Sequence, residues 1–434
     1  MTETLIIAAP SSGAGKTVAT LALLALMRAR GVRVAAAKVG PDYIDPAFHA
    51  AATGRDCLNL DPWAMSDAEL AARLSQAADG AELLLIEGVM GLFDGAADGS
   101  AATADVAARF SLPVLLVIDA GRMGASAAAL AHGFASLRND VAVAGVLFTN
   151  VASDTHASML RAAVEEQAGL AVVGALRRDA ALAQPSRHLG LVQAREHGAL
   201  DVLLRAAAEQ AAEHVSLCRL ANLTRPLPKI DGDAPALPPL GQRIAIARDD
   251  AFAFLYPHWL NDWRAAGAEM TFFSPLADET VPAEAGAVFL PGGYPELHAG
   301  QLAAAATFRA SLHAAAERGA LIYGECGGYM ALGEGLIDAD GLRHDMTGLL
   351  PVVTSFAERR LHLGYRAMAH AAPLPFPAAL RGHEFHYARE TERGDAPALF
   401  TDITDATGQP RPDAGLRVGN VMGSFLHIIS EAPS

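Results

Sequence analysis

The sequence is poor in cysteine and in positive charge. Three cysteines, Cys57, Cys218 and Cys326, stand far apart among 434 residues and form no Cys-x-x-Cys pair. This spacing argues against both a disulfide framework and a zinc site. Lysine and arginine total 33 against 48 acidic residues, which gives a formal net charge of −15. We therefore expect no nucleic-acid partner held through its phosphates.

The sequence also lacks long hydrophobic runs and a secretory leader. No apolar run is long and uninterrupted enough to cross a bilayer, and the N-terminus has no signal-peptide pattern. We expect a cytoplasmic protein without a membrane partner. Hydrophobic residues nevertheless make up 52% of the chain and charged residues 19%, so the chain can bury sizeable cores. Its length predicts two domains.

Short apolar runs alternate with helix-like Ala/Leu-rich segments over residues 1–218. The runs are TLIIAA, VRVAAAKV, ELLLIEG, PVLLVID and VAGVLFTN. Continuous hydrophobicity is typical of strands buried on both faces, and the helices between them imply parallel crossovers. The first domain is therefore predicted to be a doubly wound α/β fold.

A proline-rich stretch separates this region from a second one of similar type. Residues 219–240 contain five prolines around a Gly-Asp turn, and this composition predicts a linker. Residues 241–434 then show four strand-like runs, QRIAIARD, EMTFFSP, AVFLPGG and ALIYGEC, and two clear helices, HWLNDWRAAGA and QLAAAATFRASLHAAAERGA. We predict a second α/β domain there.

The segment APSSGAGKT, residues 9–17, lies between the first apolar run and a helical stretch. A glycine-rich turn of this kind offers backbone N–H groups and a helix N-terminus to an anion. Pro10 replaces the first consensus glycine, and the glycines could merely shape the turn. The order of strand, turn, Lys-Thr and helix still favours a phosphate loop. The residues predicted to bind ATP are Ser12, Gly13, Ala14, Gly15, Lys16 and Thr17.

Carboxylates follow two later strand-like runs. KVGPDYIDP places Asp42 and Asp45 after the second run, whereas LLLIEGVMGLFDG ends the third at Glu87 and continues to Asp94. Open α/β sheets bind ligands at the carboxyl ends of their strands, and a carboxylate near phosphates needs a cation in between. We predict Thr17, Asp45 and Glu87 as Mg²⁺ ligands. Helix capping or turn formation is the alternative role for these acids.

A second candidate site surrounds Cys326. The stretch LIYGECGGYMALGEG places this cysteine at a glycine-flanked turn from a strand into a helix, as in a nucleophile elbow. A helix N-terminus would lower the pKa of the thiol and favour the thiolate. Gly327 is one candidate oxyanion donor, and Gly292 and Gly293 in FLPGGYPE are candidates for the second. His427 in GNVMGSFLHII is the candidate base; an inert buried thiol is the alternative.

Taken together, these motifs resemble one family. The strings KVGPDYIDP, EGVMGLFDG, PSRHLGL, FFSPL, LPGGYPE, YGECGGYM and GHEFHYA are similar to those of cobyrinic acid and hydrogenobyrinic acid a,c-diamide synthases, and the resemblance covers nearly all of residues 4–428. It implies an ATP-dependent amide ligase domain, similar to dethiobiotin synthetase, joined to a class I, triad-type glutamine amidotransferase domain. It also implies a homodimer.

The resemblance implies a division of labour. Cys326, activated by His427, would release ammonia from L-glutamine. The first domain would use ATP and Mg²⁺ to convert the a and c acetate carboxylates of hydrogenobyrinic or cobyrinic acid into acyl phosphates, which ammonia then attacks. Asp42, Tyr43, Glu87 and Asp94 would line this ligase site, and the resemblance leaves open which acid binds the metal and which binds the substrate.

Some positions depart from the family pattern. Many class I glutaminases carry a glutamate two residues after the catalytic histidine, but Ile429 stands there, so no third triad member is supplied locally. Thr149 and Asn150 are shifted from the expected Asn-Arg-Val, which puts adenine contacts in doubt. Glu384 and His386 fit a site role or polar packing equally. Two competing functions are an amidase of another tetrapyrrole acid, such as sirohydrochlorin, and a non-catalytic P-loop ATPase switch, which would need no glutaminase cysteine.

Overall fold

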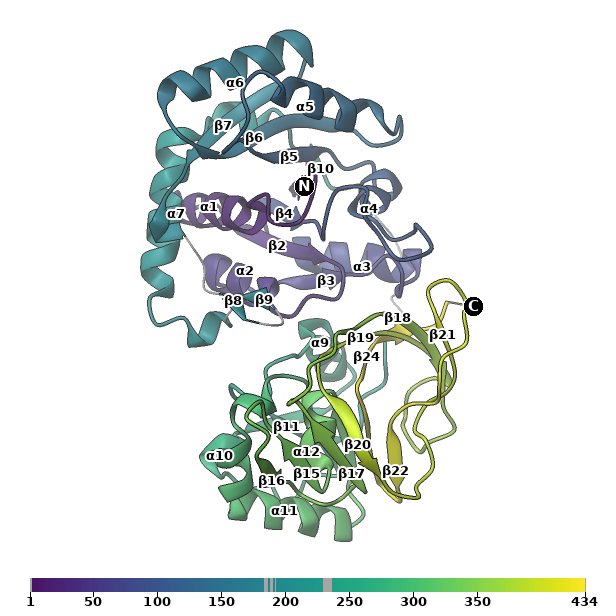
Figure 1. Cartoon of the computed structure of the whole chain (residues 1–434). Helices are drawn as coiled ribbons and strands as arrows, with labels where there is room; N and C mark the ends of the chain where they lie inside the picture. The colour runs from purple at the N-terminus through teal and green to yellow at the C-terminus, as the bar shows by residue number, and fades with distance from the viewer. Residues whose placement is uncertain (1, 183–185, 188–189, 192, 229–235, 434) are drawn as a thin grey trace. The chain divides into compact units, whose positions relative to one another are not determined.

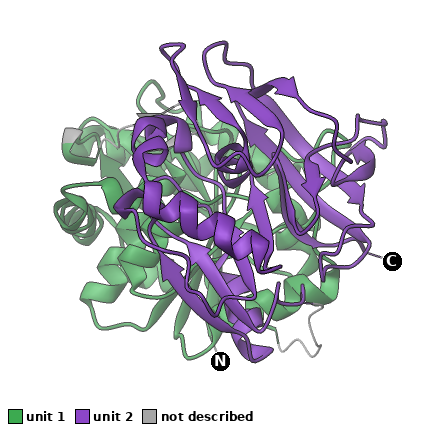
Figure 2. Ribbon diagram, turned by 90° about the horizontal axis from the view of Figure 1, so that it is seen from below, with its two compact units in different colours: residues 1–234 green, residues 235–434 purple. Residues whose placement is uncertain are grey.

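The computed structural model describes residues 2–182, 186–187, 190–191, 193–228 and 236–433. The chain divides into two compact units, Met1–Ala234 and Pro235–Ser434 (Figure 2). Each unit is built around its own largely parallel sheet.

The first unit contains an eight-stranded sheet of order β3-β2-β4-β1-β5-β6-β7, with β10 paired to the start of β1 (Figure 1). Its strands are β1 (Glu3–Ala8), β2 (Val34–Val39), β3 (Leu58–Leu60), β4 (Leu83–Glu87), β5 (Val114–Asp119), β6 (Val143–Val151), β7 (Ala171–Arg177) and β10 (Arg225–Pro226). All pairings along the main path are parallel. The five strands predicted for this region are confirmed, and β3, β7 and β10 are additional.

Helices cover both faces of this sheet. They are α1 (Lys16–Ala29), α2 (Asp45–Thr53), α3 (Asp67–Ala78), α4 (Thr103–Arg109), α5 (Ala127–Ser136), α6 (Asp154–Gln167), α7 (Leu200–His214) and α8 (Leu217–Ala221). Right-handed crossovers place α1 and α2 on one face and α3 to α6 on the other. In agreement, α1 packs against α2 and α7, while α5 packs against α6 (Figure 1). The doubly wound arrangement is confirmed.

Short elements connect β7 to α7. They are η1 (Ala180–Leu182), β8 (Ser186–Arg187), β9 (Gly190–Leu191) and η2 (Ala194–Glu196). The string PSRHLGL falls in this stretch and lies partly outside the described residues.

The first part of the predicted linker belongs to the first unit. Within residues 219–240, α8 extends to Ala221, and β10 pairs antiparallel with Glu3 and Thr4 of β1. Pro226 is tolerated because it lies in a two-residue strand at the end of a ladder. The boundary between the units falls between Ala234 and Pro235, and residues 229–235 of the predicted linker lie outside the described residues.

The second unit contains a six-stranded sheet of order β12-β11-β13-β14-β23-β22. Its strands are β11 (Arg243–Ala247), β12 (Glu269–Phe273), β13 (Ala287–Leu290), β14 (Leu321–Glu325), β22 (Leu416–Val418) and β23 (Val421–Ser424). All its pairings are parallel except that of β22 with β23. The four strands predicted from the sequence are therefore confirmed as neighbours in one sheet.

The helices of this unit agree with the prediction except that one long predicted helix is interrupted. They are α9 (Pro257–Ala265), η3 (Pro275–Ala277), η4 (Pro295–Leu297), α10 (Ala299–Ala304), α11 (Ala306–Glu317) and α12 (Gly327–Leu332). The long helix predicted over residues 301–320 is interrupted at Ala305, whose ψ of 73° is not helical. The Ala-rich composition favours a helix throughout but does not reveal this break.

Two further four-stranded sheets complete the second unit, in the orders β16-β15-β17-β20 and β21-β18-β19-β24. Their strands are β15 (Gly335–Ile337), β16 (Arg343–Asp345), β17 (Val352–Ser355), β18 (His362–Ala369), β19 (Ala379–His386), β20 (Arg389–Arg393), β21 (Thr401–Asp405) and β24 (Leu426–Glu431). These sheets were not predicted, because several of their strands are polar and largely exposed, as in the RETER of β20. Among the described residues, no helix is both long and apolar enough to span a membrane.

Candidate active sites

The phosphate-loop segment adopts the turn that its glycines predict. Gly13 and Gly15 have φ values of 80° and 84°, a region that favours glycine. A Cβ atom on Gly15 would also lie 3.2 Å from the side chain of Thr149 on β6. The Thr149 hydroxyl in turn donates a hydrogen bond to the carbonyl of Ala14 at 2.9 Å. Thr149, considered above for adenine contacts, thus supports the loop.

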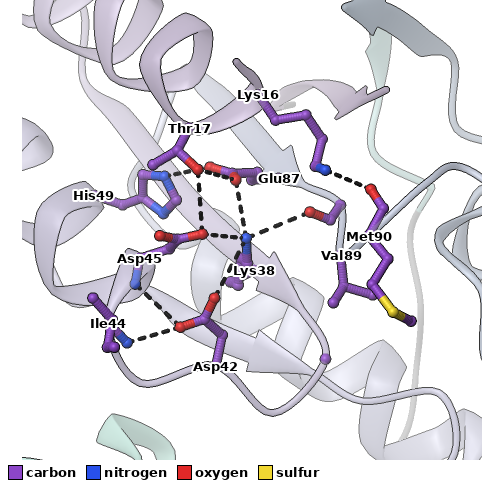
Figure 3. Close-up of polar contacts among 12 residues, drawn as sticks. Lys16, Thr17, Lys38, Asp42, Ile44, Asp45, His49, Glu87, Val89 and Met90 are labelled. Carbon is purple, nitrogen blue, oxygen red and sulfur yellow. Dashed lines mark hydrogen bonds and ion pairs between the residues drawn. The ribbon is translucent and has the colours of Figure 1, made fainter. Parts of the chain in front are cut away.

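Lys16 begins α1 directly after this turn. Its ammonium group donates a hydrogen bond to the carbonyl of Met90, in the loop after β4 (Figure 3). Burial and the nearby Lys38 lower the pKa of Lys16. An ammonium that is partly desolvated and near a second cation is well suited to an anionic ligand.

The three residues predicted to bind Mg²⁺ converge. The Thr17 hydroxyl oxygen lies 2.9 Å from Glu87 Oε1 and 3.3 Å from Asp45 Oδ2 (Figure 3). Asp45 begins α2 and Glu87 ends β4, so the parallel sheet brings the two carboxylates to the same edge as the phosphate loop. A hydroxyl and two carboxylates are the hard oxygen donors that suit Mg²⁺.

Lys38, at the end of β2, is the central residue that sequence analysis missed. Its ammonium nitrogen lies 2.6 Å from Asp45 Oδ2, 2.9 Å from Glu87 Oε1 and 3.6 Å from Asp42 Oδ2 (Figure 3). Burial lowers the pKa of Lys38, but these carboxylates outweigh burial and raise it well above its usual value. A lysine inside the apolar run VAAAKV could have been recognised, because a buried cation requires partners.

The two central carboxylates respond to their surroundings in opposite ways. Burial and the neighbouring Asp42 raise the pKa of Asp45 to about 7. Burial also acts to raise the pKa of Glu87, but Lys38 and His49 outweigh it and lower that pKa. His49 Nε2 lies 2.7 Å from Glu87 Oε2, and Cys57 Sγ lies 3.8 Å from His49 Nδ1. The oxygen set fits a divalent cation, for which Lys38 would have to release part of its contacts.

The remaining predicted ligase residues have local structural contacts. Asp42 Oδ1 accepts hydrogen bonds from the backbone N–H groups of Ile44 and Asp45 at 2.8 and 3.2 Å, at the start of α2. Asp94 Oδ2 accepts one from the N–H of Gly91 at 3.0 Å. Tyr43, next to Asp42, is partly exposed. Asp42 and Asp94 thus organise turns, although Asp42 also contributes to the charge around Lys38.

Cys326 occupies a strained turn between β14 and α12. Its φ of 47° and ψ of −101° are unusual for a residue with a side chain. The flanking glycines permit close packing of this turn: a Cβ on Gly328 would lie 1.8 Å from the carbonyl oxygen of Leu290, and one on Gly324 would lie 2.8 Å from the Gly328 carbonyl carbon. This is the geometry of the predicted nucleophile elbow.

The two predicted oxyanion donors approach one another beside Cys326. A Cβ on Gly327 would lie 3.1 Å from the backbone nitrogen of Gly293. A Cβ on the preceding Gly292 would lie 2.5 Å from Cε1 of His427. The loop after β13 therefore brings the backbone nitrogen of Gly293 close to the elbow, as an oxyanion hole requires, and Gly292 close to the ring of His427.

His427 lies on β24. This strand begins one residue, Phe425, after the end of β23, and β23 pairs with β14. The ring of His427 stacks on that of His383 at a centroid distance of 4.8 Å. Burial, His383 and His386 lower the pKa of His427 well below its usual value. The resting imidazole is therefore neutral and able to accept a proton.

The expected stabilisation of the Cys326 thiolate is wrong. Burial, followed by the negative charge of Glu296, raises the pKa of Cys326 well above its usual value, and the N–H of Gly327 opposes this only in part. The helix N-terminus can be recognised in the sequence, whereas the burial of the thiol and its acidic neighbours cannot. The uncharged thiol therefore needs a general base before it can act as a nucleophile.

Glu384 and His386 form an ion-paired cluster with Arg366. Glu384 Oε1 lies 2.9 Å from His386 Nε2, and Oε2 accepts a hydrogen bond from Arg366. Burial acts to raise the pKa of Glu384, but His386 and Arg366 outweigh it and lower the pKa to about 2. His362 offers a further nitrogen within 4.8 Å, although its ring is parallel to that of His386, at 3°. Parallel imidazoles aim poorly at one metal ion, so these contacts favour ion-paired packing.

Two family models divide the chain as the fold does. The "CobQ/CobB/MinD/ParA nucleotide binding domain" matches residues 5–192, and the "CobB/CobQ-like glutamine amidotransferase domain" matches residues 243–434. A glutamine amidotransferase structure from Thermotoga maritima aligns with 43% of this chain and 75% of its own, with 17% identity and a TM-score of 0.29.

Curated relatives match along the whole chain. A hydrogenobyrinate a,c-diamide synthase from a Sinorhizobium species is 56% identical over 99% of both chains. The protein of the same description from Rhizobium meliloti is 54% identical over 98% of both chains. The chain therefore belongs to the hydrogenobyrinate a,c-diamide synthase family and is a glutamine-dependent amidating ligase with an N-terminal nucleotide-binding domain and a C-terminal glutamine amidotransferase domain.

Proposed function

We propose that this enzyme converts the a and c acetate carboxylates of hydrogenobyrinic acid, a metal-free corrinoid, into carboxamides during cobalamin biosynthesis. The observation that carries the proposal is the 56% identity over 99% of the chain to a protein described as acting on hydrogenobyrinate. Cobyrinic acid, the cobalt-containing relative, is the alternative substrate. We also propose that the enzyme acts in the cytoplasm as a homodimer.

In the second unit, Cys326 would attack the side-chain amide of glutamine. His427, which burial and the neighbouring histidines keep neutral in the resting protein, takes the proton of the thiol. The N–H groups of Gly293 and Gly327 stabilise the oxyanion. His427 then passes its proton to the amide nitrogen, and collapse of the tetrahedral intermediate releases ammonia and leaves a thioester. Water then attacks the thioester, which releases glutamate and regenerates the thiol.

In the first unit, residues Ser12 to Thr17 would hold the phosphates of ATP. A corrinoid carboxylate attacks the terminal phosphorus, which forms an acyl phosphate and ADP. Ammonia then attacks the carbonyl carbon, and phosphate leaves as the amide forms. Lys16 offsets the charge of the transferred phosphoryl group, whereas Asp42, Tyr43 and Asp94 border the substrate.

Thr17, Asp45 and Glu87 would hold Mg²⁺, because the Thr17 hydroxyl oxygen lies 2.9 Å from Glu87 Oε1 and 3.3 Å from Asp45 Oδ2. When bound, the ion supplies charge neutralisation for the phosphates. Lys38 keeps the carboxylates close together in the ion-free protein by sharing its ammonium group among them.

An amidation assay tests the proposal. Hydrogenobyrinic acid and cobyrinic acid are incubated separately with the enzyme, ATP, Mg²⁺ and glutamine, and the products are analysed by mass spectrometry. We expect two carboxyl-to-amide conversions on hydrogenobyrinic acid. Conversion of cobyrinic acid alone would reassign the substrate, and no conversion of either acid would contradict the proposed reaction.

The nitrogen source tests the division of labour. Cys326→Ala should abolish glutamine-dependent amidation but retain amidation with a high concentration of ammonium salt, because the ligase site uses ammonia from either source. Equal loss with glutamine and with ammonia would contradict the two-site mechanism.

A further inference from the structure

Glu325, the residue immediately before Cys326, has a well-defined set of contacts at the end of β14. Its side chain is buried, with 2% exposure. Oε1 lies 2.9 Å from the Tyr323 hydroxyl and 3.1 Å from the backbone nitrogen of Ile428, both of which donate to it. Oε2 lies 3.8 Å from Nδ1 of His427.

The two hydrogen-bond donors to Oε1 fix the position of Oε2, the other oxygen of the Glu325 carboxyl group. Burial raises the pKa of Tyr323 well above its usual value, so its hydroxyl stays protonated and remains a donor. The N–H of Ile428 is fixed in β24, next to His427 in the sequence. Both donors therefore hold the carboxyl group in one orientation, with Oε2 on the side of His427.

His427 needs such a partner. To accept the proton of Cys326 through Nε2, the neutral imidazole must carry its own proton on Nδ1, and a carboxylate that accepts from Nδ1–H selects that tautomer. Ile429, which stands at the usual position of the acid, is apolar and 1% exposed. The ring stack with His383 fixes the plane of the imidazole but does not choose between its tautomers.

We infer that Glu325 is the positioning residue of this glutaminase: its carboxylate accepts a hydrogen bond from Nδ1–H of His427 and so keeps Nε2 unprotonated, the state in which it can take the proton of Cys326. The residue that precedes the nucleophile thereby replaces an acid following the histidine. The 3.8 Å separation is longer than a hydrogen bond, and catalytic contacts commonly tighten when substrate binds. The inference rests on the proposed roles of Cys326 and His427.

The environment of the pair adds a pH dependence. Burial raises the pKa of Glu325 to about 8, although the N–H of Ile428 and the hydroxyl of Tyr323 act to lower it. When Glu325 is protonated, it can donate a hydrogen bond to Nδ1 of His427. This selects the tautomer of His427 that carries its proton on Nε2, and a protonated Nε2 cannot act as the base. Ionised Glu325 accepts from Nδ1–H, so glutamine hydrolysis should increase as pH rises through this pKa.

The test is Glu325→Gln in the full chain. The amide oxygen would still accept from Tyr323 and Ile428, so the NH₂ group would face Nδ1 and select the wrong tautomer. We expect kcat for glutamine hydrolysis to fall by about 100-fold or more. KM for glutamine should be unchanged, and the rate of ammonia-dependent amidation should be retained. The rise with pH near the Glu325 pKa should disappear.

Tyr323→Phe is the matched control, because it removes one donor to Oε1 and leaves Oε2 available to His427. Its kcat should fall by less than about tenfold. Equal effects of the two substitutions, or a normal kcat and pH profile for Glu325→Gln, would overturn the inference. Cys326→Ala is measured in parallel: if it still hydrolyses glutamine, the proposed glutaminase mechanism itself fails.

A measurement on the unaltered chain guards against misfolding of the variant. With ¹⁵N-labelled histidine, NMR should show His427 protonated on Nδ1 and not on Nε2 at a pH above the Glu325 pKa. The opposite tautomer at every pH would overturn the inference.

Discussion

Replacing Lys38 by methionine should destabilise the first unit strongly when Mg²⁺ is absent. Lys38 contacts Asp45 and Glu87 at 2.6 and 2.9 Å, and the side chains of these two acids are only 15% and 1% exposed. Removing one member of a buried ion pair leaves uncompensated charge and costs about 3–5 kcal/mol. Methionine retains much of the aliphatic stem, so the loss should come mainly from the missing ammonium group.

The assay is urea unfolding in the presence of a chelator. Unfolding is monitored by hydrogen exchange and mass spectrometry of peptides from β2 and β4, which report on the first unit alone, because the two units can unfold separately. Arg33→Met is the matched control. It removes an ion pair with Glu82 whose side chains are 66% and 49% exposed, so it should cost at most about 1 kcal/mol. Mg²⁺ should restore part of the stability of Lys38→Met, since binding to the folded state stabilises it. Equal shifts for the two variants would refute the reasoning.

Three further outcomes follow from the structure. Gly328→Ala should prevent normal folding of the elbow, because its Cβ would lie 1.8 Å from the Leu290 carbonyl oxygen; Gly133→Ala in α5, which meets no atom within 4 Å, should instead raise the free energy of unfolding by up to about 1 kcal/mol. Thr149→Val should increase KM for ATP by about tenfold or less, because it removes one hydrogen bond to the phosphate loop; an unchanged KM would contradict this role. Glutamine hydrolysis by the unaltered enzyme should increase with pH as the Glu325 carboxyl group, whose pKa is raised to about 8, loses its proton; a flat profile would contradict it.

Local patterns predicted the elements that carry the sites. The apolar runs of β1, β2 and β4 are buried on both faces, so their hydrophobicity is continuous and easily recognised. Glycines before Lys16 and around Cys326 indicated tight turns, which the structure contains as residues of positive φ or as close backbone contacts. The two four-stranded sheets of the second unit were missed, because several of their strands, such as β20, are short, polar and largely exposed and so lack a continuous apolar run.

Charge required the tertiary structure. Sequence alone placed Asp45 and Glu87 at the ends of strands, but only the parallel sheet brings Lys38 between them and separates their pKa values. The expected thiolate of Cys326 was wrong for the same reason: a helix start is visible in the sequence, whereas burial and the approach of Glu296 are not.

The sequence by itself determined the two α/β cores, the phosphate loop, the elbow cysteine and the family, since each depends on residues adjacent in the chain or on long matching strings. The tertiary structure decided which distant groups face one another: Lys38 with Asp45 and Glu87, and Glu325 with His427. Electrostatic partnership depends on separation in space and on exclusion of water, and neither is encoded at a fixed sequence spacing.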